Sequence, residues 1–121
     1  MEIFFVDGEL ARSCNDGVIR TRRFGTVVAP VLRRRLAEIA AAAHLAELRR
    51  LPQARLRGHA DGRLLVALGP TADLHLRPRD DPPPMADGHL VEWAVRSLLV
   101  TGVQLAPQPE LPPLIRREAS R

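Results

Sequence analysis

The strongest structural signal in the sequence is TVVAPVLRRRLAEIAAAAHLAELRR, residues 26–50. Apolar residues recur there every three or four positions, the spacing that gathers side chains on one face of a helix. They are Val28, Leu32, Leu36, Ile39, Ala43 and Ala46. Thr26 or Ala29 is placed to be the N-cap, and Pro30 then falls near the first turn, where its missing N–H costs least. We expect a helix with one buried side, then a second helical piece that reaches Arg50 and ends at Pro52.

The other side of this helix carries charge. Arg33, Arg34 and Glu38 lie off the apolar stripe, and Arg34 and Glu38 are four residues apart. Oppositely charged residues at this spacing face each other on a helix surface. The charged side is therefore expected to face solvent.

Upstream of the helix, the sequence predicts a strand and shorter helical pieces. Ile3 to Val6 is β-branched and aromatic and ends at Asp7-Gly8, which is typical of a first strand followed by a turn. Asp7 is placed to cap a helix that runs to about Ser13. Asn15 to Gly17 is a turn signal, and residues 18–24 have room for a short helical turn before Gly25.

Downstream, the apolar period changes from helical to two. Arg55, Arg57 and His59 alternate with apolar or small residues, and residues 64–68 form an apolar run, so paired strands are expected. Residues 73–77 predict a further strand with one apolar and one chargeable face, which Pro78 closes. Residues 78–89 are expected to be a Pro-rich loop, and residues 93–103 a last strand or short helix. This order predicts an α+β fold of one domain, with the helices on one face of the sheet.

The charge of the chain is uneven. All 18 basic residues are arginine, and residues 12–57 hold 11 of them against Asp16, Glu38 and Glu47, a net charge of +8. The remaining residues carry seven arginines and 11 acidic residues, a net charge of −4. A concentrated positive field attracts polyanions such as RNA phosphates, or an acidic protein partner.

Several classes of protein are disfavoured by composition. Cys14 is the single cysteine, which excludes an intrachain disulfide and a multi-cysteine zinc site. Four scattered histidines lack metal-ligand spacing, so we expect no metal and no other cofactor. The first residues include an acid where a signal peptide carries positive charge, and no stretch approaches the roughly 20 apolar residues of a membrane span. We therefore expect a cytoplasmic protein.

Three segments together resemble the RelE/ParE superfamily of small bacterial toxins, in particular its HigB-like branch. They are MEIFF at residues 1–5, the segment from Phe24 to Leu56, and RPRDDPPPMADGHLVEW at residues 77–93. The resemblance covers residues 1–106 and leaves residues 107–121 as a Pro-rich tail. It implies a RelE-like fold, a small antiparallel sheet with N-terminal helices packed on one face.

The resemblance also implies a function. Such toxins belong to type II toxin–antitoxin pairs, cleave mRNA in the ribosome and are bound by a helix-turn-helix antitoxin. The sequence departs from the family where its chemistry is usually found: Gly58 to Arg63 is a shorter hairpin with one arginine, Asp73 replaces an arginine, and Val103 to Ala106 replaces a Tyr-His type ending. A degenerate toxin-fold protein that only binds its antitoxin is therefore the alternative.

Cleaving RNA through its 2′ hydroxyl needs a base, an acid and cations for the charged phosphorane. The best candidate groups stand on two predicted strands. His59, His75 and Arg77 are the candidate catalytic residues. The candidate RNA-binding residues are Arg55, Arg57, Arg33, Arg34 and Arg63.

Simpler interpretations stand beside these. Alternating polar residues are also what a solvated sheet face produces, and Asp73 can pair with Arg55 or Arg77. Arg33 to Arg35 can equally form a solvated helix face. His44 is expected to be structural, and Trp93 to be in the core or to stack on an RNA base. Direct DNA binding ranks last because no recognition helix is apparent.

Overall fold

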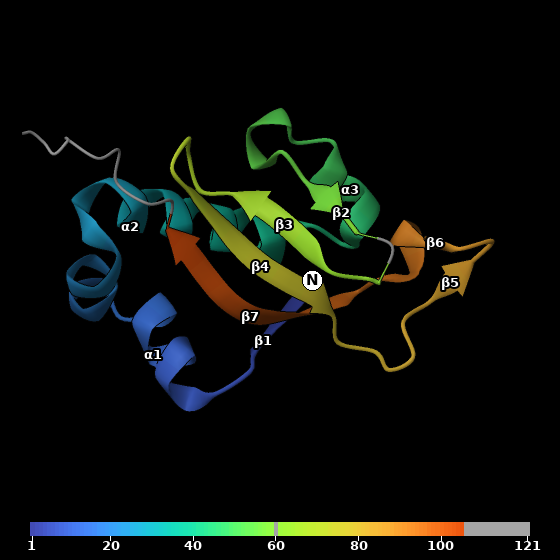
Figure 1. Cartoon of the computed structure of the whole chain (residues 1–121), viewed down its shortest axis with the longest axis horizontal. Coiled ribbons are helices and arrows are strands. Elements are labelled where there is room, and N and C mark those ends of the chain that lie inside the picture. Colours follow the sequence, from blue (N-terminus) through green and yellow to red (C-terminus); the bar gives the residue numbers. More distant parts are fainter. Residues whose placement is uncertain (60, 106–121) are drawn as a thin grey trace, which may run out of the picture.

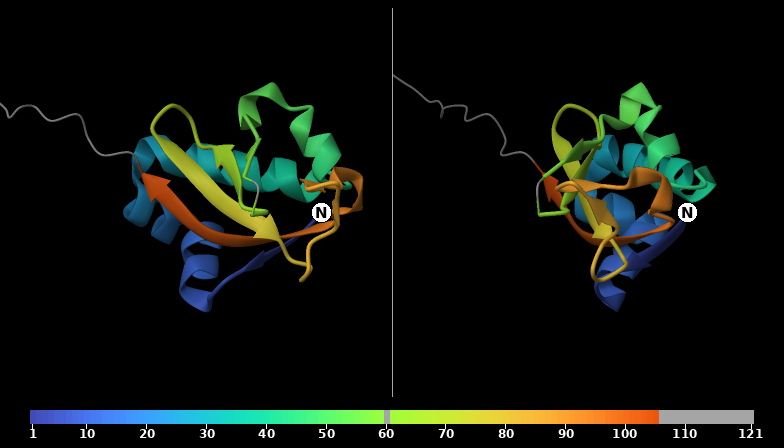
Figure 2. Two further views of the ribbon diagram at one scale, coloured as in Figure 1. Left: turned by 45° about the vertical axis from the view of Figure 1, so that its right-hand side comes forward. Right: turned by 90° about the vertical axis from the view of Figure 1, so that its right-hand side faces the viewer.

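The computed structural model describes residues 1–59 and 61–105, which form three helices on one side of a sheet (Figures 1 and 2). The first half of the chain contains β1 (Glu2–Phe5), α1 (Gly8–Asn15), α2 (Gly17–Ala41), α3 (Leu45–Arg49) and the 3-10 turn η1 (Pro52–Ala54). The second half contains β2 (Arg57–Gly58), β3 (Leu64–Ala67), β4 (Ala72–Pro78), β5 (Met85–Ala86), β6 (His89–Leu90), η2 (Glu92–Ala94) and β7 (Ser97–Leu105). The predicted α+β class with N-terminal helices on one face is confirmed. The expected tail, residues 107–121, lies outside the described residues.

Two aspartates start the first two helices. Asp7 Oδ1 accepts a hydrogen bond from Leu10 N at 2.7 Å, as the sequence predicts. Asp16 Oδ1 accepts from Val18 N at 2.9 Å and from Ile19 N at 3.0 Å, so this turn residue is also an N-cap. Both carboxylates satisfy backbone N–H groups that a helix leaves without a partner.

Helix α2 is bent at Gly25. The φ angle of this residue is 89°, which glycine adopts without strain, and the helix continues on either side of it. The break falls where the sequence predicts one. Thr26 and Ala29 lie within the helix, whose N-cap is Asp16, so neither is the N-cap that we expected. Pro30 lies one turn beyond Gly25, where few intrahelical bonds are lost.

The five-stranded sheet has the order β1-β7-β4-β3-β2. Neighbouring strands are antiparallel except at the edge, where β1 runs parallel to β7. The sheet is therefore mixed and differs here from the expected antiparallel one. A parallel pair cannot be joined by a tight turn, and α1 and α2 begin the long connection between these two strands.

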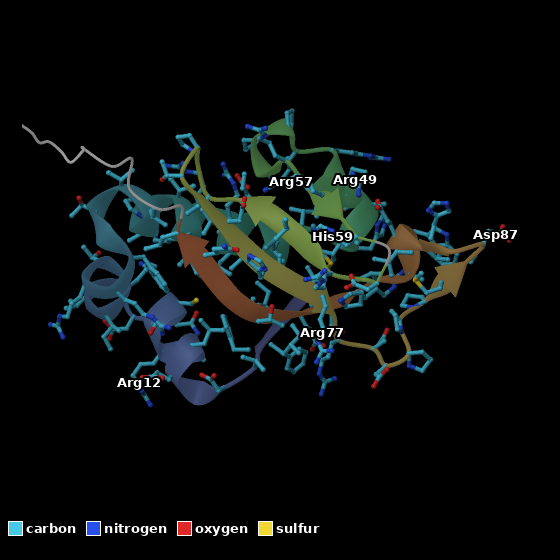
Figure 3. All side chains as sticks on the ribbon, in the orientation of Figure 1. Arg12, Arg49, Arg57, His59, Arg77 and Asp87 are labelled. Carbon is cyan, nitrogen blue, oxygen red and sulfur yellow. The ribbon has the colours of Figure 1, made fainter. Side chains whose placement is uncertain are left out.

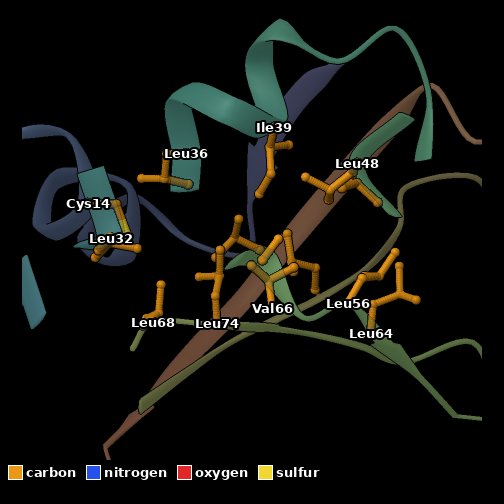
Figure 4. Close-up of a cluster of buried hydrophobic side chains, with 14 of the residues drawn as sticks. Cys14, Leu32, Leu36, Ile39, Leu48, Leu56, Leu64, Val66, Leu68 and Leu74 are labelled. Carbon is orange, nitrogen blue, oxygen red and sulfur yellow. The ribbon is translucent and has the colours of Figure 1, made fainter. Parts of the chain in front are cut away.

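The core lies between α2 and the inner face of the sheet (Figure 4). Leu32 and Ile39 of α2 are fully buried, as are Leu74 on β4 and Leu98 and Val100 on β7. Alternation along β4 leaves Asp73, His75 and Arg77 on the opposite, outer face. No described helix covers that outer face, which is turned toward the viewer in Figure 1.

Residues 78–89 contain more structure than the expected loop. β5 and β6 pair as a small hairpin, with Met85 opposite Leu90, and this hairpin projects past one end of the sheet in Figure 1. The short segment η2 then leads into β7, the last strand that the sequence predicts. Among the described residues, none of the helices is both long and apolar enough to cross a membrane.

Candidate functional site

The outer face of the sheet carries its polar residues in rows across the strands. In one row Arg57 is opposite Leu65, Leu65 is opposite His75, and His75 is opposite Gly102. The next row runs from Arg77 to Leu99 and then to Phe4. Residues in register on neighbouring strands lie on the same side of a sheet. The structure therefore places Arg57, His75 and Arg77 on one open surface, which we call the outer face. Figure 3 labels Arg57 and Arg77 on this surface.

Arg57 is held by an acid. Its guanidinium forms an ion pair with the carboxylate of Asp73, across the intervening strand β3. The two side chains are 45% and 34% exposed, so water screens the pair. Of the arginines considered, Asp73 thus pairs with Arg57 and not with Arg55 or Arg77.

His75 forms a hydrogen bond with the side-chain amide of Gln104. Its Nε2 lies 2.9 Å from Gln104 Oε1 on β7. When Nε2 donates this hydrogen bond, Nδ1 keeps the lone pair and is the nitrogen able to accept a proton. His75 also borders a shallow hollow of about 240 Å³ with Thr101 and Gly102, and Gly102 places no side chain beside the imidazole.

A bulge in β7 puts Gln104 on this face. His75 is opposite Gly102, but the next residue, Leu76, is opposite Val100, so Thr101 is an extra residue in β7. A one-residue shift reverses which side chains face the core. Val103 therefore packs against the core, and Gln104 reaches His75.

Arg77 is exposed and differs from Arg57 in having no carboxylate partner among the described residues. It borders a pocket of about 370 Å³ that is lined by two more arginines, Arg63 and Arg79, and by three aspartates, Asp61, Asp80 and Asp81. The Arg77 guanidinium is therefore not held in an ion pair with any described residue, but carboxylates share its pocket.

His59 lies beyond the end of β2, where its backbone N donates to Arg63 O at 2.9 Å. Only Arg57 and Gly58 form β2, since Arg55 has a left-handed backbone with φ of 45° and His59 lies in the hairpin turn. The prediction that Arg55, Arg57 and His59 share one strand is therefore wrong. His59 borders a pocket of about 400 Å³ with His89, Met85 and the Arg49–Glu92 ion pair, at one end of the sheet. His59 and His75 line different pockets.

Arg55 contributes to another pocket, of about 350 Å³, near the turn between β3 and β4. Arg57, Asp73 and Gln104 border the same pocket. Arg55 is exposed, so its guanidinium adds positive charge beside the Arg57–Asp73 pair.

Arg63 is tied to its own hairpin. Its Nε lies 2.7 Å from Asp61 Oδ2, and its backbone N donates to Asp61 Oδ1 at 3.1 Å. The backbone hydrogen bond is the main cause that lowers the pKa of Asp61, so this carboxylate stays charged and offsets Arg63. Arg63 is thus a weaker phosphate ligand than Arg77.

The arginines of α2 are divided between surface and interior. Arg33 and Arg34 are exposed, but α2 lies behind the sheet, away from the outer face (Figure 1). Arg35 is buried, with its Nε donating to Ala67 O at 3.0 Å and its Nη1 3.2 Å from Glu38 Oε1. Glu38 therefore pairs with Arg35, and the expected Arg34–Glu38 pair does not form. Arg35 is unavailable to RNA.

Two further expectations concern aromatic residues and histidine. Trp93 is 65% exposed, so its placement in the core is wrong; it lies in η2, outside the packed face of the sheet. His44 is the N-cap residue of α3 and lies between two helices, not within one. Its Nδ1 is buried and has no hydrogen-bond partner among the described residues.

No group of three or more His, Cys, Asp or Glu side chains is arranged to hold a metal ion within residues 1–59 and 61–105. The outer face carries guanidinium groups, the imidazole of His75, the amide of Gln104 and the carboxylate of Asp73. Those groups can bind a phosphate and exchange a proton.

No protein family model matches the chain, and neither a curated protein nor a solved structure matches it. The chemistry of the outer face therefore carries the functional argument.

Sequence reasoning identified Arg57, His75 and Arg77 but missed Gln104. A glutamine near the end of a strand carries no signal by itself, and simple alternation along β7 places it on the wrong face.

Proposed function

We propose that the protein is the toxin of a type II toxin–antitoxin pair, a cytoplasmic endonuclease that cleaves mRNA on the ribosome. One observation carries the proposal. His75 lies on an uncovered sheet face between Arg57 in its own row and Arg77 in the next. The resemblance to HigB-like toxins supports membership of the toxin family but not the catalytic residues, because the sequence departs from that family at its usual catalytic positions.

The positions of these groups suit phosphodiester chemistry. Arg57 and Arg77 are placed to hold the phosphate oxygens, where guanidinium groups form paired hydrogen bonds. The Nδ1 of His75 accepts the proton of the 2′ hydroxyl as its oxygen attacks the phosphorus. The bond from phosphorus to the 5′ oxygen breaks, and this oxygen takes a proton from water. The products are a 2′,3′-cyclic phosphate and a free 5′ hydroxyl.

The open geometry favours dependence on the ribosome. The hollow beside His75 is shallow, and His59 lines a different pocket, so no second histidine lines the hollow beside His75. Efficient attack needs the 2′ oxygen in line with the departing oxygen. A ribosome that holds the mRNA in such a conformation supplies what the shallow surface lacks.

A translating extract tests the proposal. Purified protein is added, and the 5′ ends of the mRNA are mapped by primer extension, with a ribosome-free reaction as the control. We expect new ends only when ribosomes are present, and we expect His75→Ala and Arg77→Ala to abolish them. His59→Ala is the matched histidine control and is expected to remain active. Intact mRNA with undiminished translation, from folded protein, contradicts the proposal.

A second candidate function follows from two contacts on the same face. Asp73 neutralises Arg57, and Gln104 occupies Nε2 of His75, which leaves Arg77 as the one unpaired cation among the three. This arrangement favours a non-catalytic toxin-fold protein that binds a helix-turn-helix antitoxin. It predicts a stable complex with that antitoxin and no new mRNA ends in the extract.

A further inference from the structure

The outer face continues past Arg77 to an arginine stacked on an aromatic ring. The guanidinium carbon of Arg79 lies 4.0 Å from the centroid of the Phe4 ring. Arg79 follows β4 at a bend, and its backbone N donates to Ser97 O at 3.1 Å, so the hydrogen bonding to β7 continues to this residue. The stack joins the edge strand β1 to the end of β4.

The stack faces the same side as the candidate site. Phe4 is opposite Leu99, and Leu99 is opposite Arg77, which places all three side chains on the outer face. Phe4 accordingly lies outside the core cluster, whereas its neighbours Ile3 and Phe5 pack against that cluster. Arg79 also borders the pocket of about 370 Å³ that Arg77 lines, together with the carboxylates of Asp61, Asp80 and Asp81.

The guanidinium of Arg79 has capacity for a further partner. Arg79 is exposed, and no carboxylate pairs with it in the described part of the chain. The guanidinium carbon lies over the ring of Phe4. Unpaired bases stack on guanidinium planes as well as on aromatic rings.

We propose that Arg79, supported by Phe4, is a stacking platform for an unpaired nucleobase. The inference rests on the proposed function and adds that the substrate is single-stranded at this position. His75 and Arg79 are four residues apart along an extended chain, about 13 Å. The platform therefore takes the base of a nucleotide next to the cleaved one, while Arg77 binds the phosphate between them.

The test separates stacking from charge. Binding of a short labelled single-stranded RNA is measured against salt concentration for the wild type, Arg79→Lys and Phe4→Leu. Lysine keeps the positive charge and removes the plane. Arg12→Lys is the matched control because Arg12 is an exposed arginine on α1, away from the outer face (Figure 3). A parallel series uses RNAs with one abasic nucleotide placed at successive positions.

We expect Arg79→Lys and Phe4→Leu to bind the intact RNA about 10-fold more weakly, within the range of one base stack. The salt dependence of binding stays unchanged for Arg79→Lys because the number of cations is the same. The wild type loses a similar factor at one abasic position, and the variants lose nothing further there. Arg12→Lys binds like the wild type.

The proposal is overturned if Arg79→Lys binds the RNA as tightly as the wild type and responds to abasic positions in the same way. The contact between Arg79 and Phe4 is then structural only. This result does not affect the proposal that His75 cleaves RNA. Failure of the folded wild-type protein to bind single-stranded RNA also overturns the platform, and the extract assay then decides the proposed function separately. Circular dichroism establishes whether each variant is folded. If Phe4→Leu is not folded, the comparison of Arg79→Lys with the wild type is sufficient to test the proposal.

Discussion

Replacing Asp73 by asparagine is expected to tighten RNA binding, because Asp73 occupies the guanidinium that a phosphate needs. A phosphate and a carboxylate that bind one guanidinium from different sides lie about 6 Å apart, since each accepts hydrogen bonds of about 2.8 Å from it. Two unit charges at that distance repel by about 0.7 kcal/mol in water and about 3 kcal/mol at the lower effective dielectric near a protein surface. Because the two side chains are 45% and 34% exposed, the lower half of this range applies. We expect a gain of about 3- to 20-fold in affinity, since about 1.4 kcal/mol is a factor of 10.

The same substitution has a second signature. It frees one cation for the backbone, so the slope of log K against log salt concentration steepens by about 0.7 for a single strand. Loss of an exposed ion pair lowers the free energy of unfolding by no more than about 1 kcal/mol. Fluorescence anisotropy titrations across a salt series measure both the affinity and the slope.

Asp87→Asn is the matched control for this experiment. Asp87 is an exposed aspartate in the turn between β5 and β6, so its replacement makes the same change in net charge far from Arg57 (Figure 3). Equal gains for Asp73→Asn and Asp87→Asn mean that overall charge alone accounts for the effect. That result, or weaker binding by Asp73→Asn, refutes the idea that Asp73 competes with phosphate.

Three further predictions concern protonation and stability. Burial raises the pKa of the Cys14 thiol to about 11 from its usual 9.0. The contribution of the thiol to the free energy of unfolding is therefore full below pH 9 and is lost as the pH rises through 11. Since the chain contains neither lysine nor tyrosine, whose side chains also titrate in this range, chemical denaturation should show this alkaline loss in the wild type and not in Cys14→Ala. Gln104→Leu removes the acceptor at Nε2 of His75, so the ¹⁵N NMR spectrum, dominated in the wild type by the tautomer protonated at Nε2, should show a mixture of tautomers. Asp7→Ala removes the N-cap of α1 and should lower the free energy of unfolding in urea by about 1 kcal/mol, whereas an unchanged midpoint means that the cap contributes nothing.

Much of the fold could be predicted because its signals are local. The helical stripe around Leu32 and Ile39, the cap at Asp7 and the break at Gly25 each depend on a few neighbouring residues, and each is present in the structure. The exposure of Trp93 was not predictable, since an aromatic residue in an apolar sequence is more often buried than exposed.

The candidate site was predictable only along a single strand. Alternation in β4 correctly placed His75 and Arg77 on one face. The residues opposite His75 and Arg77 on neighbouring strands depend on the register between strands, and this register could not be predicted from the sequence. The bulge at Thr101 and the left-handed backbone of Arg55 both change where side chains point, and neither has a strong local signal.

The pairing of β1 with β7 has a consequence for how the protein is made. The ribosome synthesises the first strand long before its neighbour, Ser97–Leu105, which also joins β1 to β4. Until that strand emerges, Phe4 and Arg77 have no common surface, and residues 2–5 are an edge without a partner. The nascent chain therefore assembles its outer face only after Ser97–Leu105 has left the ribosome.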